Sequence, residues 1–237
     1  MTPTSNAHQS ARDKRTARAQ EKVSQAKAAA RRQTMLRLGV GLGVLIVIGV
    51  LFTIFRSANQ DPQADVSGGS GKYVYQTGEP GAGEPAIDFS LPSTQGGTLG
   101  LADLEGKTVL TYWHEGLGCQ PCWDQIRAFE DDPDALEAEG IDEFVSITSG
   151  PVDALAQKMA DDGLDSTTLA DTDLAVSRQY QMNQFGMMGD SRDGHSFVLI
   201  GPDGEILWRA DYGGAPNYTM FVPVDILLEQ MKAGLQS

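Results

Sequence analysis

Apolar and polar positions follow short, regular patterns along most of the second half of the chain. A near-continuous apolar run over 108–113 predicts a buried central strand, and a helical pattern follows it to about residue 130, with an extension after Pro133 to Glu139. Other predicted strands are 87–91, 98–101, 144–148, 168–170, 195–200 and 205–209, and other predicted helices are 101–106, 152–160, 172–180 and 224–231. This order predicts an α/β domain with a central sheet and helices on its faces.

One much longer apolar segment lies before this domain. Residues 36–55 (LRLGVGLGVLIVIGVLFTIF) would form a helix about 30 Å long, which is the hydrocarbon thickness of a bilayer. A cleaved signal peptide is the competing interpretation. The 35-residue polar leader is too long for an ordinary signal, and Arg56-Ser57-Ala58-Asn59 is a poor cleavage site. The segment therefore predicts an uncleaved transmembrane anchor.

Charge divides the chain at this segment. Residues 1–37 carry nine Lys or Arg against two acidic residues, whereas residues 57–237 carry eight against thirty. The positive-inside rule then predicts a cytoplasmic N-terminus and an extracytoplasmic acidic domain. Because phosphate backbones repel such a domain, nucleic acid is not an expected partner.

Four regions are expected from these patterns. They are a basic cytoplasmic tail (1–35), the anchor (36–55), a flexible linker rich in Gly, Ser and Pro (56–85) and the α/β domain (86–237). The segment Lys72–Tyr75 interrupts the linker, either as an edge strand or as a piece lying on the domain surface.

The two cysteines of the chain, Cys119 and Cys122, lie between the predicted central strand and the helix after it. Unpaired backbone N–H groups at a helix start stabilise a thiolate, and two thiols this close can form a reversible disulfide. A structural disulfide closing so short a loop would remove little chain entropy. The pattern therefore favours a redox-active pair over a structural or a metal-binding pair.

Three pieces of the chain carry a family resemblance: PAIDFSLPSTQGG-TLGLADLEGKTVLTYW, CQPC and FVLIGPDGEILWR. With them, residues 79–237 resemble the thioredoxin-fold redoxins, which include peroxiredoxins and membrane-tethered thiol–disulfide oxidoreductases. The resemblance implies a thioredoxin-like mixed sheet flanked by helices, with Cys119 as exposed nucleophile and Cys122 as buried resolving thiol. The expected function is disulfide exchange with extracytoplasmic protein thiols, without a cofactor and with the direction of electron flow open.

At two positions this sequence differs from the residues that are usual in these families. The place of the cis-proline that usually faces the thiols, before the strand 195–200, is taken by His195. In the peroxiredoxin motif Pro-x-x-x-Thr-x-x-Cys, the proline and threonine positions are Tyr112 and Gly116, so the peroxide-binding hydroxyl is absent. We expect His195 to tune the pKa of the thiols or to relay protons to them, with His114 and Glu115 as further candidates for these roles. The alternative is that His195 is an ordinary polar residue at a strand end.

Two alternative functions stay open from the sequence. Cys119, Cys122 and His195 resemble, in part, the copper ligands of membrane-anchored Sco-type chaperones, which have a different cysteine spacing and an earlier histidine. Two thiolates and an imidazole suit copper, and Met182, Met187 and Met188 would be nearby soft ligands. The other alternative is a thiol peroxidase with an antioxidant role, in which Cys119 attacks the peroxide.

Overall fold

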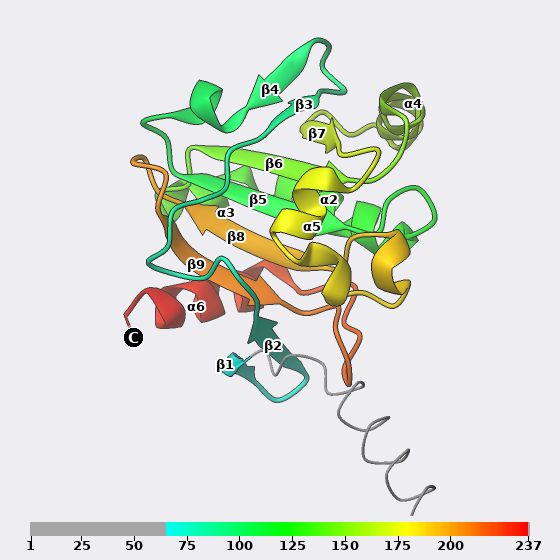
Figure 1. Ribbon diagram of the computed structural model, residues 1–237. Helices are drawn as coiled ribbons and strands as arrows, with labels where there is room; N and C mark the ends of the chain where they lie inside the picture. Colours follow the sequence, from blue (N-terminus) through cyan, green and yellow to red (C-terminus); the bar gives the residue numbers. More distant parts are fainter. Residues whose placement is uncertain (1–64, 237) are drawn as a thin grey trace, which may run out of the picture. The chain divides into compact units, whose positions relative to one another are not determined.

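The computed structural model describes residues 65–236, and these form a mixed sheet with helices on its faces (Figure 1). The strand order is β1-β2-β9-β8-β5-β6-β7. Strands β5, β6 and β7 are parallel, and β8, β9, β2 and β1 are joined by antiparallel pairing. The strands of this sheet are β1 (Asp65–Ser70), β2 (Tyr73–Thr77), β5 (Val109–His114), β6 (Glu143–Thr148), β7 (Thr167–Ala170), β8 (Ser196–Ile200) and β9 (Ile206–Asp211).

The remaining elements cover the sheet or its edges. A separate hairpin pairs β3 (Ser90–Pro92) with β4 (Thr98–Gly100), as the glycine turn predicts, and it is shorter than expected. The α-helices are α2 (Gln120–Glu130), α3 (Pro133–Ala138), α4 (Val152–Asp162), α5 (Ala175–Gln179) and α6 (Val224–Leu235), and the 3-10 helices are η1 (Leu101–Leu104), η2 (Met182–Gln184) and η3 (Gly189–Ser191). The predicted α/β class and central sheet are therefore confirmed.

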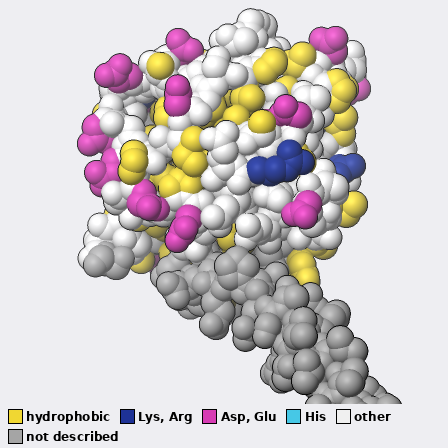
Figure 2. All heavy atoms as spheres, in the orientation of Figure 1, with side chains coloured by type: hydrophobic (Ala, Val, Ile, Leu, Met, Phe, Trp, Pro, Cys, Tyr) yellow, Lys and Arg dark blue, Asp and Glu magenta, His cyan; other side chains and the backbone are white. Residues whose placement is uncertain are grey.

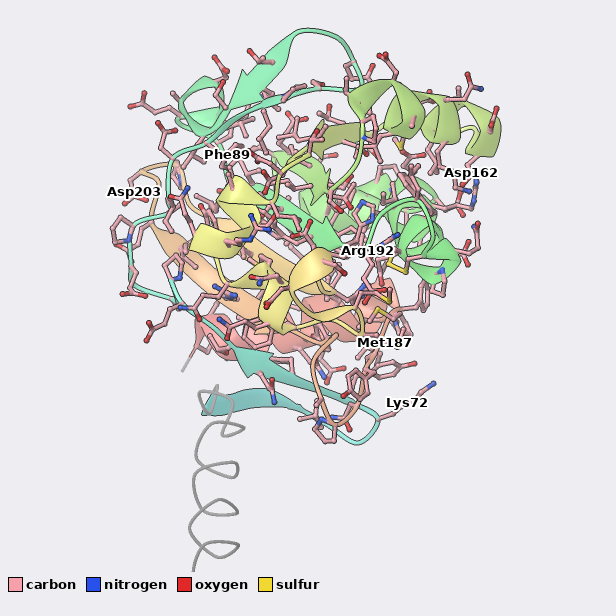
Figure 3. The ribbon with its side chains drawn as sticks, turned by 45° about the vertical axis from the view of Figure 1, so that its right-hand side comes forward. Lys72, Phe89, Asp162, Met187, Arg192 and Asp203 are labelled. Carbon is pink, nitrogen blue, oxygen red and sulfur yellow. A yellow bond between two sulfur atoms is a disulfide. The ribbon has the colours of Figure 1, made fainter. Side chains whose placement is uncertain are left out.

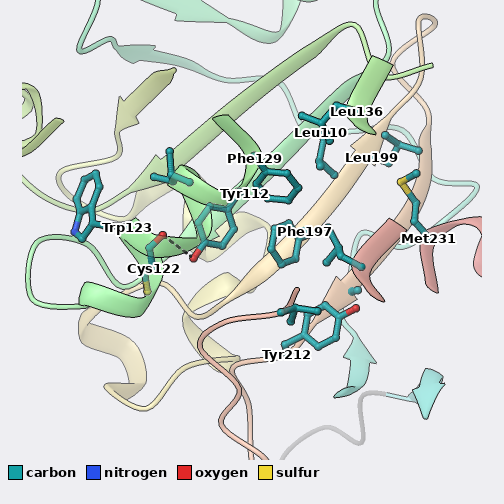
Figure 4. Packing of buried hydrophobic residues seen from close by; sticks show 14 of the residues in the cluster. Leu110, Tyr112, Cys122, Trp123, Phe129, Leu136, Phe197, Leu199, Tyr212 and Met231 are labelled. Carbon is teal, nitrogen blue, oxygen red and sulfur yellow. Dashed lines mark hydrogen bonds between the residues drawn. The ribbon is translucent and has the colours of Figure 1, made fainter. Parts of the chain in front are cut away.

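The two faces of the sheet bury two separate hydrophobic clusters, because side chains alternate along each strand. Even-numbered residues of β5, such as Leu110 and Tyr112, pack under α2, α3, α4 and α6 with Phe197 of β8 (Figure 4). Odd-numbered ones, such as Trp113, pack under α5, η1, η2 and the hairpin with Val198. The six buried residues of β5 explain why its sequence reads as a continuous apolar run.

The sequence-based boundary at residue 86 differs from the structure, because β1 and β2 belong to the sheet. Gln76 of β2 pairs with Asp211 of β9, and the Tyr75 ring is buried against Trp208 and Tyr212. The Gln230 side chain of α6 donates a hydrogen bond to the Tyr73 carbonyl. Composition suggested a flexible linker here because backbone pairing onto a sheet edge requires few apolar side chains.

A fully buried ion pair anchors the segment that follows β2. Arg209 donates from Nε to Asp211 at 2.9 Å, and its terminal guanidinium nitrogens donate to the carbonyl oxygens of Pro80 and Tyr180. Asp211 in turn accepts the backbone N–H of Gly78 at 2.7 Å. The pair therefore joins β9 to residues 78–80 and to the chain just before η2.

No helix between residues 65 and 236 is long and apolar enough to cross a membrane. The predicted basic tail (1–35) and the predicted anchor (36–55) lie outside the described residues.

Candidate functional site

The thiol pair lies where β5 ends and α2 begins. Cys119 is the N-cap residue of α2, Pro121 occupies its first turn, and the two cysteines form a disulfide. The Cys119 side chain is 7% exposed, whereas that of Cys122 is fully buried. Once reduced, a Cys119 thiolate would sit against the unpaired N–H groups of the helix start, which lower a thiol pKa. Cys119 is the less buried of the two, but it is not exposed in the disulfide form as expected, and the roles of nucleophile and resolving thiol stay predictions.

Tyr112, which sequence reasoning did not single out as a functional residue, connects the thiol helix to His195. Its hydroxyl lies 2.8 Å from His195 Nδ1 and donates to the Cys122 carbonyl at 3.4 Å, the dashed line in Figure 4. A hydroxyl has one proton, so with both bonds formed His195 Nδ1 carries hydrogen and donates it to Tyr112. The Nε2 atom of His195 is then an unprotonated acceptor, and it has no hydrogen-bond partner among residues 65–236.

His195 and His114 occupy facing positions. The antiparallel register pairs Tyr112 with Phe197 and Trp113 with Ser196, so one further step brings His114 opposite His195. His114 Nδ1 accepts the N–H of Gly116, which leaves the proton of a neutral His114 on Nε2. That Nε2 is also buried and unpartnered within the described part of the chain.

Both imidazoles are held neutral by burial. Loss of solvation lowers the pKa of His114 to about 3, and the same effect, with His114 as a further cause, lowers the pKa of His195 to about 3. Neither ring therefore carries a positive charge at neutral pH in the disulfide form. Only His195, through its unprotonated Nε2, presents a free acceptor for a proton, because His114 Nδ1 is engaged by Gly116.

Glu115 is buried beneath the loop that precedes β8. Its carboxylate accepts the backbone N–H of Met187 at 2.7 Å, and its carbonyl accepts a bond from the Arg192 guanidinium at 2.9 Å. A Cβ atom at Gly118 would lie 3.4 Å from Arg192, so this cation stands beside the residue preceding Cys119. Figure 3 shows Met187 and Arg192 together in this loop. Arg192 is a charge near the thiols to which sequence reasoning gave no role there.

Trp123 completes the surroundings of the pair. Its indole N–H donates to the Gly116 carbonyl, and its ring meets the edge of His114 with 5.0 Å between centroids. The ammonium of Lys158 lies 5.7 Å from the indole centroid and bonds the Gln120 side chain. The sequence signal for this residue was its place directly after Cys122 on the apolar side of a predicted helix.

The two other positions singled out in the sequence are settled by the backbone. Two cis X-Pro bonds are present between residues 65 and 236, at Glu79–Pro80 and Ala215–Pro216, and neither lies directly before β8, where His195 stands. Gly116 has a φ of +84°, and a Cβ there would lie 2.9 Å from the Thr148 hydroxyl. The position that a threonine takes in the peroxiredoxin motif is therefore closed to any side chain without a shift of the backbone.

The disulfide form does not present the ligand set of the copper alternative, which stays a prediction for the reduced chain. Within residues 65–236, no three His, Cys, Asp or Glu side chains are grouped to hold a metal ion. Cys119 and Cys122 are joined in a disulfide, which offers no thiolate. Met182 is buried against Arg209 instead of facing the sulfurs, while Met187 and Met188 are exposed.

A buried carboxyl lies two residues before His195 and gives a testable pH dependence. Burial raises the pKa of Asp193 to about 8, with the nearby Asp171 carboxyl adding to the effect. Between about pH 4 and pH 8 the folded chain keeps a proton that the unfolded chain releases, so stability falls as pH rises. We expect Asp193→Asn to flatten this fall, which is at most about 1.4 kcal/mol per pH unit.

Urea unfolding of the parent chain and of Asp193→Asn at about pH 5, 7 and 8.5 measures how the free energy of unfolding of each depends on pH. Asp153→Asn, at an exposed position of α4, is the matched control and should keep the parental pH dependence. Parallel curves for the parent chain and Asp193→Asn would show that Asp193 is already ionised when folded.

Comparisons with known proteins agree with this geometry. A family model described as the AhpC/TSA family matches residues 82–209. Peroxiredoxin Bcp of Escherichia coli strain K12 is 30% identical over 128 residues, which cover 53% of this chain and 81% of that protein.

Two solved structures share the fold. Peroxidoxin BcpB from Mycobacterium tuberculosis matches with a TM-score of 0.53 and 18% identity, covering 66% of this chain and 96% of that one. The reduced 2-Cys peroxiredoxin of Plasmodium vivax matches with a TM-score of 0.52 and 23% identity, covering 62% and 78%. At these identities the likeness concerns the thioredoxin-like fold alone.

Proposed function

Because the chain belongs to the AhpC/TSA family of thiol-based oxidoreductases and peroxidases, we propose that it exchanges its Cys119–Cys122 disulfide with the thiols or disulfides of partner proteins. The observation that carries this proposal is the disulfide itself, between a helix N-cap and a buried position one turn further on. Such a pair opens and closes by thiol–disulfide exchange.

The reductive direction illustrates the proposed steps. The Cys119 thiolate attacks a partner disulfide, forming a mixed disulfide and releasing one partner thiolate, which takes a proton from solvent. Cys122 then loses its proton and attacks Cys119, and the bond to the partner breaks with release of the second thiolate. The partner is reduced by two electrons and the Cys119–Cys122 disulfide is restored. The oxidative direction is the reverse.

His195 is proposed as the acceptor of the Cys122 proton. Its unprotonated Nε2 lies on the α2 side of the sheet, and Tyr112 links its Nδ1 to the Cys122 backbone. Burial opposes a lasting imidazolium, so His195 would hold the proton only transiently. His114 faces it with the proton on Nε2 and its Nδ1 engaged by Gly116 N–H, so it offers no free acceptor. Glu115, already engaged by Met187 N–H, would hold the loop in place.

A protein partner is supported by exposed apolar side chains around Cys119, here called the apolar rim: Leu117, Met187, Met188 and Phe221. Leu117 precedes the thiols, and the Met187 backbone is bonded to Glu115. Phe221 lies beside Val222, whose N–H donates to Gln125 on α2. Several exposed apolar side chains on segments that border one site are typical of protein-binding surfaces and are of little use to a small peroxide.

The proposal includes the membrane tether expected from residues 36–55, which would hold the acidic domain outside the cytoplasm. Oxidised thiol pairs persist in such compartments. Protease treatment of intact cells tests this part: cleavage of the domain with protection of residues 1–35 is expected, and the converse pattern would reverse the topology.

Peroxide reduction is the second candidate, favoured by the 30% identity to a peroxiredoxin. The closed position at Gly116 opposes it. We expect Gly116→Thr to leave peroxide consumption unchanged and to lower stability by about 1–3 kcal/mol, because the left-handed backbone and the Thr148 contact exclude the new side chain. A Gly116→Ala chain separates backbone strain from the hydroxyl, and a peroxidase activity gained only with threonine would favour the second candidate.

Two assays on the reduced full-length chain distinguish disulfide exchange from peroxide reduction. Insulin disulfide reduction and hydrogen peroxide consumption are measured as second-order rates under the same conditions. Exchange faster with insulin than with peroxide is expected. The opposite ranking would make the chain a peroxidase.

A further inference from the structure

An apolar hollow of about 430 Å³ lies at the end of α2 remote from the thiols. Its lining comes from the C-terminal turn of α2, from α3 and from the start of β6. The apolar lining residues are Phe129, Leu136, Ile141 and Phe144. Since α2 has 11 residues, the hollow is about 16 Å along the helix from Cys119 and is separate from the exchange site.

Carboxylates surround this hollow. Residues 129–144 contain eight Asp or Glu and no Lys or Arg. Some are already engaged: Glu143 pairs with Lys107, Glu139 pairs with Lys232, and Glu130 accepts the N–H groups of residues 165 and 166. Asp142 accepts the Thr108 N–H.

Four exposed carboxylates remain without an ion pair or hydrogen bond within residues 65–236: Asp131, Asp132, Asp134 and Glu137. The hydroxyl oxygen of Ser166, which also lines the hollow, is buried and unpartnered there. Unpaired carboxylates around an apolar hollow attract a ligand that combines positive charge with an apolar group. A second copy of this domain presents the same charge and is repelled.

We propose that the hollow and the carboxylates around it form a groove that binds a basic segment of a partner protein. One large apolar side chain of that segment would occupy the hollow, with lysine or arginine on both sides of it. A volume of about 430 Å³ is sufficient for a leucine or phenylalanine side chain with neighbouring backbone. The flanking cations meet Asp134 and Glu137, and the Ser166 hydroxyl is available to the bound backbone. The same partner could then engage Cys119 with a second segment, at raised effective concentration.

The groove proposal is tested with a fluorescein-labelled peptide, KKLFKK, added to the full-length chain and followed by fluorescence anisotropy. Binding is expected to weaken about five- to tenfold in Asp134→Asn/Glu137→Gln, because two of the charges around the hollow are lost. It should also weaken with rising salt, which screens exposed charges. The control Asp153→Asn/Glu229→Gln removes the same charge from exposed positions of α4 and α6 and should bind as the parent chain does.

The apolar part is tested with the peptides KKSSKK and SSLFSS, both of which should bind at least about fivefold more weakly. Equal affinity for KKLFKK and KKSSKK, or an equal loss in the two charge variants, would overturn the proposal. Carbodiimide cross-linking of the full chain alone tests the competing occupant: bonds between lysines of residues 1–35 and carboxylates of residues 129–144 would assign the groove to the chain's own tail. Insulin reduction measured on the same variants reports on the exchange site independently.

Discussion

Cys119→Ser is expected to reduce disulfide exchange to background, whereas Cys122→Ser should retain the first half of the reaction. Serine at position 119 removes the nucleophile, and a hydroxyl at the N-cap cannot attack a disulfide at neutral pH. With Cys122→Ser the Cys119 thiolate still attacks, but nothing resolves the mixed disulfide. The second variant should therefore accumulate as a covalent adduct with its partner.

Non-reducing electrophoresis after acid quenching measures the adduct, and insulin turnover measures the complete reaction. Serine is close to cysteine in size, and thermal unfolding of each reduced variant checks that the fold is kept with a hydroxyl at the buried position 122. If Cys122→Ser turned over insulin as fast as the parent chain, the resolving role would belong to another group. Adduct formation by Cys119→Ser would assign the nucleophile to Cys122.

Arg209→Met is expected to lower the free energy of unfolding by about 3–5 kcal/mol. The substitution leaves the Asp211 carboxylate buried without its cation and also leaves the Pro80 and Tyr180 carbonyls without their donor. For a domain of this size the melting temperature should fall by roughly 6–20 °C. The effect is large because the desolvated carboxylate, and not only the lost attraction, opposes folding.

Chemical unfolding of the full-length chain measures the loss, and Arg178→Met, at an exposed position of α5, should change stability by less than about 0.5 kcal/mol. The double variant Arg209→Met/Asp211→Asn, which removes both charges, should recover part of the loss. A loss equal to that of Arg178→Met would show that water or a shift of the chain solvates Asp211. In that case the buried pair would contribute little.

The core of the site was predictable from the sequence because its signals are local. The apolar run of β5, the helical spacing after it and Pro121 in the first helical turn together place Cys119 at a helix start. Gly116 was noted only for the hydroxyl it lacks. Its positive φ and the crowding by Thr148 depend on β6, and no pattern around residue 116 announces them.

The partners of His195 were not predictable, because they depend on the register between strands far apart in sequence. That register places His114 opposite His195 and brings Tyr112 diagonally against it. His195 lies immediately before β8, one residue ahead of the strand that was predicted to start with it, and its bond to Tyr112 depends on the sheet. Arg209 likewise stands at the end of a predicted strand, 205–209, and nothing local indicates that its guanidinium turns inward to Asp211.

The boundary of the domain was misplaced for a related reason. Residues 65–77 have a composition that favours flexibility in isolation, and their order comes from β9 and α6, more than 130 residues later. Sequence patterns report what a segment prefers by itself. They do not report a sheet edge that the rest of the chain builds for it.

The position of β2 also determines when the protein can finish folding during its synthesis. Gly78 and Asp211 are 133 residues apart, and Tyr73 and Gln230 are 157 residues apart. At about 5–20 residues per second, β2 leaves the ribosome roughly 7–27 s before β9, the strand that joins it to the rest of the sheet. Through that interval the Tyr75 ring has neither Trp208 nor Tyr212 to cover it. The first structured segment of the domain to be made is therefore among the last to be secured.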